Sequence, residues 1–175
     1  RDLVYRRRRF IVVTLLAAVV FALLFVMIGL VEQFNAEPVD TVAAIGADSW
    51  VIPEGITGPF TALSAAPAQA IDAIEADTKS AVVVSRSNLL DDGEPVDVVL
   101  FGHEVGGLGT PSLVAGRAVA ESGELVVDET AGLEVGQQVT IGGLDLTVVG
   151  ETENITMLAG TPMAFVALAD AQNIV

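Results

Sequence analysis

The pattern of apolar and polar positions divides the chain into two regions of different character. Residues 10–31 read FIVVTLLAAVVFALLFVMIGLV and contain no charged side chain. As an α-helix, a run of this length would extend about 33 Å, whereas the hydrocarbon core of a bilayer is roughly 30 Å thick. The pattern therefore predicts that residues 10–31 form a transmembrane helix.

Two other interpretations of this run are weaker. A soluble domain of this size rarely buries a helix that is apolar on every face, and a run of four arginines beside such a helix would be unexpected. A cleaved signal peptide usually has an apolar region of about 7–15 residues followed by an A-x-A-like site. Residues 32–37, EQFNAE, contain no such site. A membrane span is therefore the preferred interpretation.

Residues 32–48 are predicted to form a helical connector to the domain that follows. Proline disfavours a helix interior, so we expect Pro38 to interrupt the helix. A short helix is expected to follow over residues 39–45, and Gly46 would end it. Gly29 and Pro38 are the predicted flex points of this part of the chain.

Residues 49–168 alternate short β-rich runs with turn residues, which predicts one extracytoplasmic α/β domain. A helix is expected over residues 66–76, where apolar residues recur at helical spacing. Residues 169–175 are expected to begin a further helix that leads to a second span. The expected strands are Ser49–Pro53, Ala81–Ser85, Val96–Phe101, Glu124–Asp128, Gln138–Ile141, Leu144–Val149 and Ala164–Leu168.

Turn residues join some of these runs into hairpins. Asp91-Asp92-Gly93 separates two β-rich runs and Gly142-Gly143 separates two others, and both sequences are typical of tight hairpin turns. About 140 residues are enough to bury a core without cross-links. The predicted fold class is α+β, with one N-terminal transmembrane helix followed by a compact mixed α/β extracytoplasmic domain that contains a hairpin-rich β subdomain.

Charge is distributed unevenly between the two regions. The net charge is -15, but residues 1–31 carry five arginines against one acidic residue, whereas residues 32–175 carry three basic against 22 acidic residues. The positive-inside rule then places the basic segment, residues 1–9, in the cytoplasm and the acidic domain outside it. The acidic balance argues against a nucleic-acid partner.

The arginine run itself, Arg6, Arg7, Arg8 and Arg9, is the predicted anchor at the inner leaflet. Setting the topology is its simplest role. A further interpretation is that residues 1–9 form an amphipathic helix on the inner leaflet that contacts a cytoplasmic partner.

Residues that could carry catalysis or hold a cofactor are sparse. The chain has no Cys and one His, His103, which leaves little room for thiolate or histidine chemistry. The GxxxxGK[ST] motif of nucleotide-binding loops is absent. The glycine-rich stretch 102–109 has no Lys, and the acidic turn 91–94 does not have the spacing of a calcium loop. We therefore expect no catalytic residue, cofactor or metal site in this chain.

Three apolar residues are candidates for a contact surface. Phe60, Met157 and Leu158 lie in loop sequences beside glycine or polar residues, so we predict an apolar contact loop there. For Trp50, packing against the core is the preferred interpretation.

An ordered series of short motifs runs through the second half of the chain. It consists of Gly116-Arg117, GELVVD at 123–128, LEVGQQVTI at 133–141, VVG at 148–150 and FVALADAQ at 165–172. Following a basic segment and one span, this series resembles the amino-terminal part of an FtsX-like or MacB-like ABC transporter permease. The resemblance covers essentially the whole chain, and it depends on the order of the motifs rather than on any single one.

This resemblance implies a permease with four spans, whose outer domain lies between the first and the second. Such permeases usually form homodimers and work with an ATP-binding cassette subunit, which binds ATP and Mg and carries the ATPase activity. The implied location is the plasma or inner membrane, with the N-terminus in the cytoplasm. The rival interpretation is a single-pass anchored binding or scaffold domain, and the transported substrate stays open.

The helical run between a basic anchor and a folded domain suggests a mechanism. Closure of the cassette subunits on ATP would move the cytoplasmic end of the first helix. The helix would transmit this movement to the outer domain as a stiff rod that bends at Gly29 and Pro38.

Overall fold

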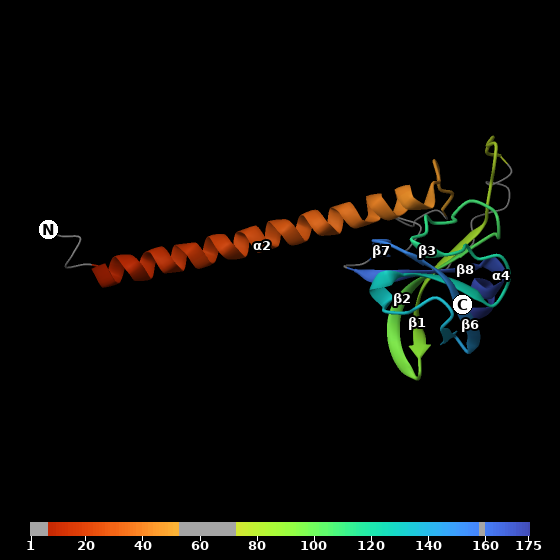
Figure 1. The fold of residues 1–175 in the computed structure, drawn as a ribbon. Helices are drawn as coiled ribbons and strands as arrows, with labels where there is room; N and C mark the ends of the chain where they lie inside the picture. The colour runs from red at the N-terminus through yellow and green to blue at the C-terminus, as the bar shows by residue number, and fades with distance from the viewer. Residues whose placement is uncertain (1–6, 53–72, 158–159) are drawn as a thin grey trace. The chain divides into compact units, whose positions relative to one another are not determined.

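The computed structural model describes residues 7–52, 73–157 and 160–175. The chain divides into two compact units, Arg1–Ala36 and Glu37–Val175. The described part of the first unit is helical, and the second unit is a mixed α/β domain (Figure 1). The predicted succession of an N-terminal apolar helix and a mixed α/β domain is confirmed.

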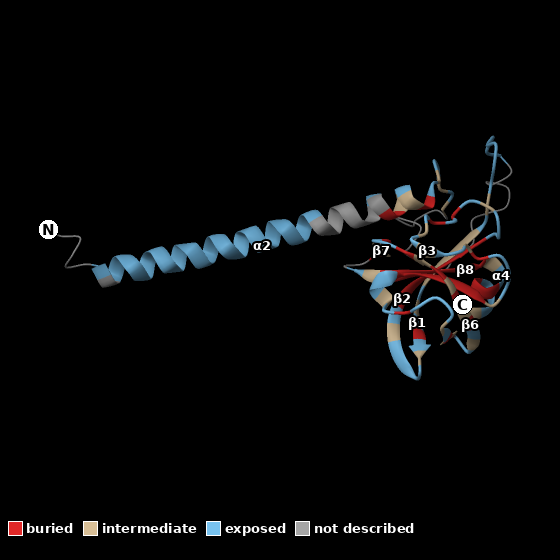
Figure 2. Ribbon diagram, viewed as in Figure 1, coloured by how far each residue is buried: buried red, intermediate tan, exposed pale blue. Residues whose placement is uncertain are grey.

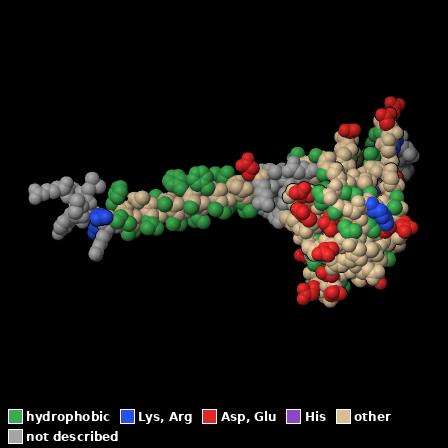
Figure 3. Space-filling view, viewed as in Figure 1, with side chains coloured by type: hydrophobic (Ala, Val, Ile, Leu, Met, Phe, Trp, Pro, Cys, Tyr) green, Lys and Arg blue, Asp and Glu red, His purple; other side chains and the backbone are tan. Residues whose placement is uncertain are grey.

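Helix α2 is formed by Arg7–Ile45, and its segment Arg9–Glu32 is long and apolar enough to cross a membrane. This segment has 24 residues and a mean hydropathy of 3.2, and its most apolar part is not buried inside the protein. Its large apolar side chains are exposed, such as Phe25 at 72%. Figure 2 shows this part of the helix as exposed, and Figure 3 shows apolar side chains along its visible face. Such a surface is stable only in apolar surroundings. The length and composition of the segment therefore fit the predicted span.

The helix does not end at Pro38, so the predicted interruption there is wrong. α2 continues to Ile45, and the N–H of Gly46 donates to the carbonyl of Ala43 at 3.1 Å. Proline removes one hydrogen bond from a helix interior, and burial of the side chains of Thr41 and Ile45 offsets this loss. The predicted helix end at Gly46 is confirmed, since its φ of +70° is the left-handed conformation common after a helix.

Besides the end of α2, the described part of the second unit contains eight strands and two short helices. They are β1 (Val82–Asp91), β2 (Glu94–His103), β3 (Ala115–Gly116), β4 (Glu124–Asp128), the 3-10 helix η1 (Glu129–Ala131), β5 (Gln138–Ile141), β6 (Leu144–Thr152), β7 (Thr156–Met157), β8 (Thr161–Ala167) and the helix α4 (Leu168–Ile174).

Six of these strands form a closed barrel. Neighbouring strands pair in the order β2-β1-β5-β6-β4-β8, and β8 pairs back onto β2. The β2–β8 and β4–β6 pairs are parallel, and the other pairs around the barrel are antiparallel. The short strands β3 and β7 pair with β6 and β8 respectively.

Alternate residues of the strands fill the interior of the barrel. On β4, Leu125 and Val127 belong to this interior cluster, and on β8 Ala164 and Val166 do so, as the two-residue period of a strand requires. Ala171 of α4 is fully buried in the same cluster. The complete interior cluster is Leu89, Val98, Leu100, Leu125, Val127, Leu133, Val139, Ile141, Leu146, Val148, Ala164, Val166 and Ala171.

The opposite faces of β2, β4 and β8 carry a second apolar layer, called the outer layer below (Figure 2). Its buried members are Ile45, Val99, Phe101, Val119, Val126, Ile155, Met157, Met163, Phe165 and Ala167. Ile45 comes from α2, and Val119 and Ile155 come from segments between strands, so these parts cover the outside of the barrel. Strand β8 is consequently buried on both faces, which accounts for its continuous apolar sequence.

Both predicted hairpin turns are confirmed. Asp92 and Gly93 have φ values of 46° and 88° between β1 and β2, and Gly142 and Gly143 have values of 57° and 85° between β5 and β6. Two-residue hairpin turns of this type require a positive φ at both central residues.

Two other predicted elements differ from the structure. The strand expected at 49–53 is wrong, because residues 49–52 are irregular and Trp50 packs onto the outer layer instead of joining the sheet. Of the helix expected at 66–76, residues 73–76 are not helical, and the remainder lies outside the described residues. The strand predictions for β4 and β5 match the observed bounds.

We expect Leu125→Ala to lower the free energy of unfolding of the second unit by about 2–5 kcal/mol. Leu125 is fully buried in the barrel interior, so truncation leaves a cavity. Val135→Ala is the matched control, since Val135 is 46% exposed and its truncation should cost less than about 0.5 kcal/mol. Urea unfolding followed by the fluorescence of Trp50, the single Trp of the chain, measures both. Equal losses in the two variants would contradict this packing.

Candidate functional site

The end of α2 is attached to the barrel by a buried contact. The hydroxyl of Thr41 donates a hydrogen bond of 2.8 Å to the carbonyl oxygen of Thr156, and Thr41 is 1% exposed. One helical turn later, Ile45 is buried in the outer layer. Residues four apart lie on one face of a helix. The face of α2 with Thr41 and Ile45 therefore binds its last turns to the domain.

An aromatic cluster lies on the same outer layer. Trp50 meets the ring of Phe101 edge to face, with centroids 6.3 Å apart and an angle of 78° between the planes. The ring of Phe101 lies 5.4 Å from that of Phe165. Such pairs contribute about 0.5–1.5 kcal/mol beyond the burial of area. The predicted packing of Trp50 against the core is confirmed.

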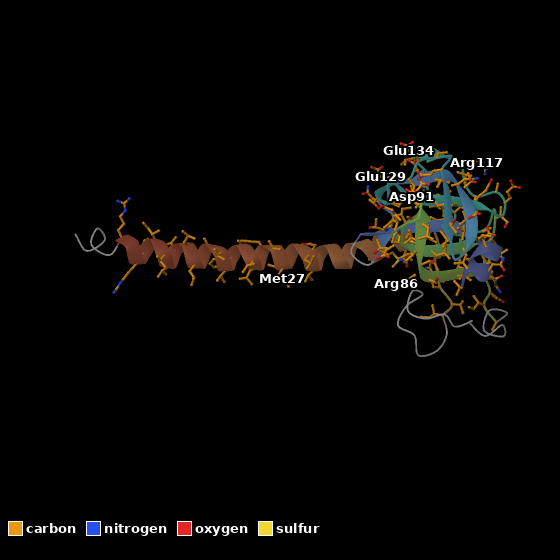
Figure 4. The ribbon with its side chains drawn as sticks, turned by 90° about the horizontal axis from the view of Figure 1, so that it is seen from below. Met27, Arg86, Asp91, Arg117, Glu129 and Glu134 are labelled. Atoms are coloured by element: carbon orange, nitrogen blue, oxygen red, sulfur yellow. The ribbon has the colours of Figure 1, made fainter. Side chains whose placement is uncertain are left out.

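Strand β4 begins at a buried carboxylate. Glu124 is 6% exposed and accepts hydrogen bonds from both terminal nitrogens of Arg117, from Ala120 N–H at 2.8 Å and from Glu121 N–H at 3.3 Å. The bidentate bond from Arg117 is the main cause that lowers the pKa of Glu124 to about 2, and the two backbone donors add to it while burial opposes it. Ionised Glu124 thereby holds the segment between β3 and β4 in place. Figure 4 labels Arg117.

Strand β4 ends at a second buried carboxylate, Asp128, which is fully buried. One carboxylate oxygen accepts from the N–H and the hydroxyl of Thr130, at 3.1 and 2.6 Å, and so caps η1. The other accepts from the Thr152 hydroxyl at 3.3 Å and from Ile155 N–H at 2.7 Å. Asp128 therefore joins the end of β4 to the connection between β6 and β7, which leads to Thr156.

A third buried carboxylate attaches α4. Asp170 is 1% exposed and accepts hydrogen bonds from the Ser122 hydroxyl and from Gly123 N–H, the latter at 2.9 Å. Close packing accompanies this contact, because a Cβ on Gly102 would collide with the Cβ of Ala171. The helix α4 is thus fixed by a polar contact to the turn before β4 and by apolar packing.

The chemistry of these groups is structural. The carboxylates of Glu124, Asp128 and Asp170 all accept from donors of their own chain. Within residues 7–52, 73–157 and 160–175, no group of three or more His, Cys, Asp or Glu residues is arranged to hold a metal ion. His103 is buried, and its Nδ1 donates to the carbonyl of Glu104 at 3.0 Å. Burial lowers the pKa of His103 and so favours the neutral ring, although the bond to Glu104 acts in the opposite direction.

The sequence-predicted anchor and flex points lie along α2. Arg7, Arg8 and Arg9 begin the helix, and Arg6 lies outside the described residues. Gly29 is inside the candidate span, and a Cβ added there would meet no atom within 4 Å. Pro38 lies inside the helix. The role of these residues in anchoring and bending stays a prediction.

Of the three residues of the predicted apolar contact loop, the structure describes one. Met157 is 4% exposed and its side chain belongs to the outer layer, so it packs within the domain. Phe60 and Leu158 lie outside the described residues, and a contact role for them stays a prediction. No local pattern in the sequence identifies Thr41 or Asp170 as a contact residue. Asp128 could have been identified, because Asp is a preferred residue immediately before a helix.

Relatives match along the whole chain. An ABC transporter permease of Mycobacterium bovis and one of Mycobacterium tuberculosis are each 29% identical to this chain over 180 residues, and a second from M. tuberculosis is 28% identical. Each alignment covers 99% of this chain and 51% of the relative, and all three relatives are described as uncharacterized. The resemblance to ABC transporter permeases is confirmed. The chain spans about half the length of the curated permeases it matches.

Two solved structures have a more distant likeness. The periplasmic region of MacB from Actinobacillus actinomycetemcomitans has a TM-score of 0.44 at 15% identity, covering 61% of this chain and 55% of that chain. The extracellular domain of the ABC-type transporter YknZ from Gram-positive bacteria has a TM-score of 0.42 at 16% identity, covering 54% and 56%. No protein-family model matches the chain. The permease relatives and the candidate span together indicate a membrane protein.

The lowered pKa of Glu124 predicts a specific dependence of stability on pH. A depressed carboxyl pKa adds stability above the unfolded value of 4.5, and this contribution is lost as the pH falls from about 4.5 to about 2. The Glu124→Gln variant should therefore lose less stability than the unmodified chain over this range. Glu94→Gln, at an exposed position at the start of β2, is the control and should follow the unmodified chain. Parallel curves for Glu124→Gln and the unmodified chain in acid would refute the assignment.

Removal of the Asp170 carboxylate should loosen α4. We expect Asp170→Ala to destabilise the second unit by about 1–3 kcal/mol, because the Ser122 hydroxyl and Gly123 N–H lose their acceptor. Amide hydrogen exchange should become faster in α4 and at Gly123. Asp97→Ala, at an exposed position of β2, serves as the control. Unchanged exchange in α4 would show that the apolar contacts alone hold the helix.

Proposed function

We propose that this chain comprises the first span and the outer domain of a permease subunit in an ABC-type export or mechanotransmission complex. In this function, ATP hydrolysis by a partner subunit moves the outer domain through α2. Three features support the proposal: the permease relatives, the candidate span Arg9–Glu32 and the attachment of α2 to the barrel.

The observation that carries the proposal is the attachment itself. Thr41 and Ile45 bury one face of the last turns of α2 in the domain, and the Thr41 bond reaches Thr156 beside β8. A helix that only tethered a domain to the membrane would need no such contacts. A buried hydrogen bond and a buried Ile together stabilise the attachment of the helix end to the barrel by a free energy on the order of a few kcal/mol. A displacement of the helix end would therefore move the barrel with it.

Charge supports the proposed orientation. The basic segment at residues 1–9 is expected on the cytoplasmic side, and the acidic second unit on the outer side. Figure 3 shows acidic side chains spread over the visible face of the domain. Anionic headgroups would repel such a surface, so the domain would stand away from the membrane rather than lie on it.

The partners follow from the same proposal. An ATP-binding cassette subunit would bind ATP and Mg and carry the ATPase activity, because the sequence given contains no nucleotide-binding loop motif. A second copy of the permease would complete the complex. In this proposal the chain is a non-enzymatic component, and Gly29 and Pro38 are the positions at which α2 bends.

A short Gly-Ser linker inserted after Asn35 should uncouple the outer domain from ATP hydrolysis. Residues 1–175 contain no Cys, so Arg86→Cys on β1 gives a single exposed site for a spin label once any Cys elsewhere in the full permease is replaced (Figure 4). In the full permease with its ATPase partner, trapping ATP should change the label-to-label distance between two copies. The linker variant should lose this change and keep normal expression and assembly.

A matched control places the same linker in the turn at Asp92 and Gly93, where an insertion leaves α2 intact. This control should keep the nucleotide-dependent change. The same change with the linker after Asn35 would refute transmission through α2. A single copy without a bound ATPase in the native membrane would instead favour the anchored scaffold domain.

A further inference from the structure

Three arginines begin the helix that carries the candidate span. Arg7, Arg8 and Arg9 are the first residues of α2 and are called the arginine collar below. Successive residues of a helix are rotated by about 100°, so three successive positions spread over more than half of its circumference. Nitrogen-bearing side chains at the start of α2 point away from the helix on opposite sides (Figure 4). Arg7 and Arg9, whose side chains are both exposed, therefore present positive charge on different sides of the helix rather than along one face.

The collar directly adjoins the apolar surface. The candidate span begins at Arg9, and Phe10, the next residue, is 62% exposed. No polar spacer separates the two. An arginine at the edge of a span extends its apolar stem along the hydrocarbon and places its guanidinium at the headgroups. At such an edge, an arginine guanidinium would therefore reach the level of the lipid phosphates.

The sequence around the arginine collar contains few acidic residues. Between Asp2 and Glu32 there is no acidic residue, and Arg7 and Arg9 are exposed in the structure. A guanidinium pairs with a phosphate through two parallel hydrogen bonds. A cluster of basic residues next to a span attracts anionic lipids. An amphipathic helix for a protein partner would concentrate its charges on one face, which the collar does not do.

We propose that the arginine collar binds the headgroup phosphates of anionic phospholipids. The collar selects lipids that carry a net negative charge, because a zwitterionic headgroup adds a cationic group beside its phosphate. This binding goes beyond the proposed function and does not depend on it. A permease and a single-pass anchored domain would both place the collar at a membrane interface.

Lipid selection by the full chain in bilayers tests the proposal. Electron spin resonance compares spin-labelled phosphatidylglycerol with spin-labelled phosphatidylcholine at the protein surface, and the ratio of their restricted fractions gives the preference. We expect roughly a three- to fivefold preference for phosphatidylglycerol, which falls at high salt. The Arg7→Gln, Arg8→Gln, Arg9→Gln triple variant should have a markedly lower ratio. Both leaflets have the same composition, so the orientation of the chain does not affect the result.

Three controls make the result specific. Arg86→Gln removes an exposed charge of the second unit and should keep the full preference. A triple Lys variant of the collar keeps the charge and should stay above the Gln variant. Inorganic phosphate should compete no better than sodium chloride at the same ionic strength, since the ligand is a lipid. Trp50 fluorescence verifies that the second unit is folded in each variant.

Equal preference in the unmodified chain and the triple Gln variant would overturn the proposal. Loss of the preference with inorganic phosphate at matched ionic strength would also overturn it, because the collar would then be a site for soluble anions. Both outcomes leave the test of the linker after Asn35 unaffected, so the two proposals can fail separately.

Discussion

The pairing of β8 with β2 is the contact on which the rest of the domain depends. These strands are parallel partners over Val99–His103 and Met163–Ala167, which are distant in sequence. Without this pair, the strands would form an open sheet and the interior cluster would be exposed at its edge. Because β8 also pairs with β4, it is the middle one of the three strands, β2, β8 and β4, that separate the barrel interior from the outer layer. Closing so long a loop costs entropy, and burial on both faces of β8 compensates for it.

Buried carboxylates fix the segments that adjoin the paired strands. Glu124 and Asp128 mark the two ends of β4, and Asp170 binds the turn that precedes it. A buried charge is costly unless it is fully hydrogen-bonded, and each of these carboxylates accepts at least two bonds. Their donors come from the segments that enter and leave the barrel wall. Polar contacts therefore determine the paths of these segments, whereas apolar burial supplies most of the stability.

Local signals predicted much of this structure. The hairpin turns at Asp92 and Gly142, the strands β4 and β5 and the end of α2 at Gly46 follow from turn chemistry and residue periodicity, which act over a few neighbours. The barrel closure does not, because the partner of β8 is set by packing between distant segments. The predicted break at Pro38 failed for a similar reason. Proline is unfavourable locally, and contacts of Thr41 and Ile45 with residues far along the chain outweigh it.

Only part of the candidate site could be predicted from the sequence. The arginine run was identified from its charge and the permease resemblance from the order of the motifs, and neither depends on the fold. The Thr41–Thr156 contact and the role of Asp170 join residues that no local pattern connects. The fold itself has a mechanical consequence. The Thr41 bond ends on β7, which pairs with β8, and α4 follows β8 directly, so a pull between α2 and α4 would act along β8 and load its hydrogen bonds to β2 and β4 in shear.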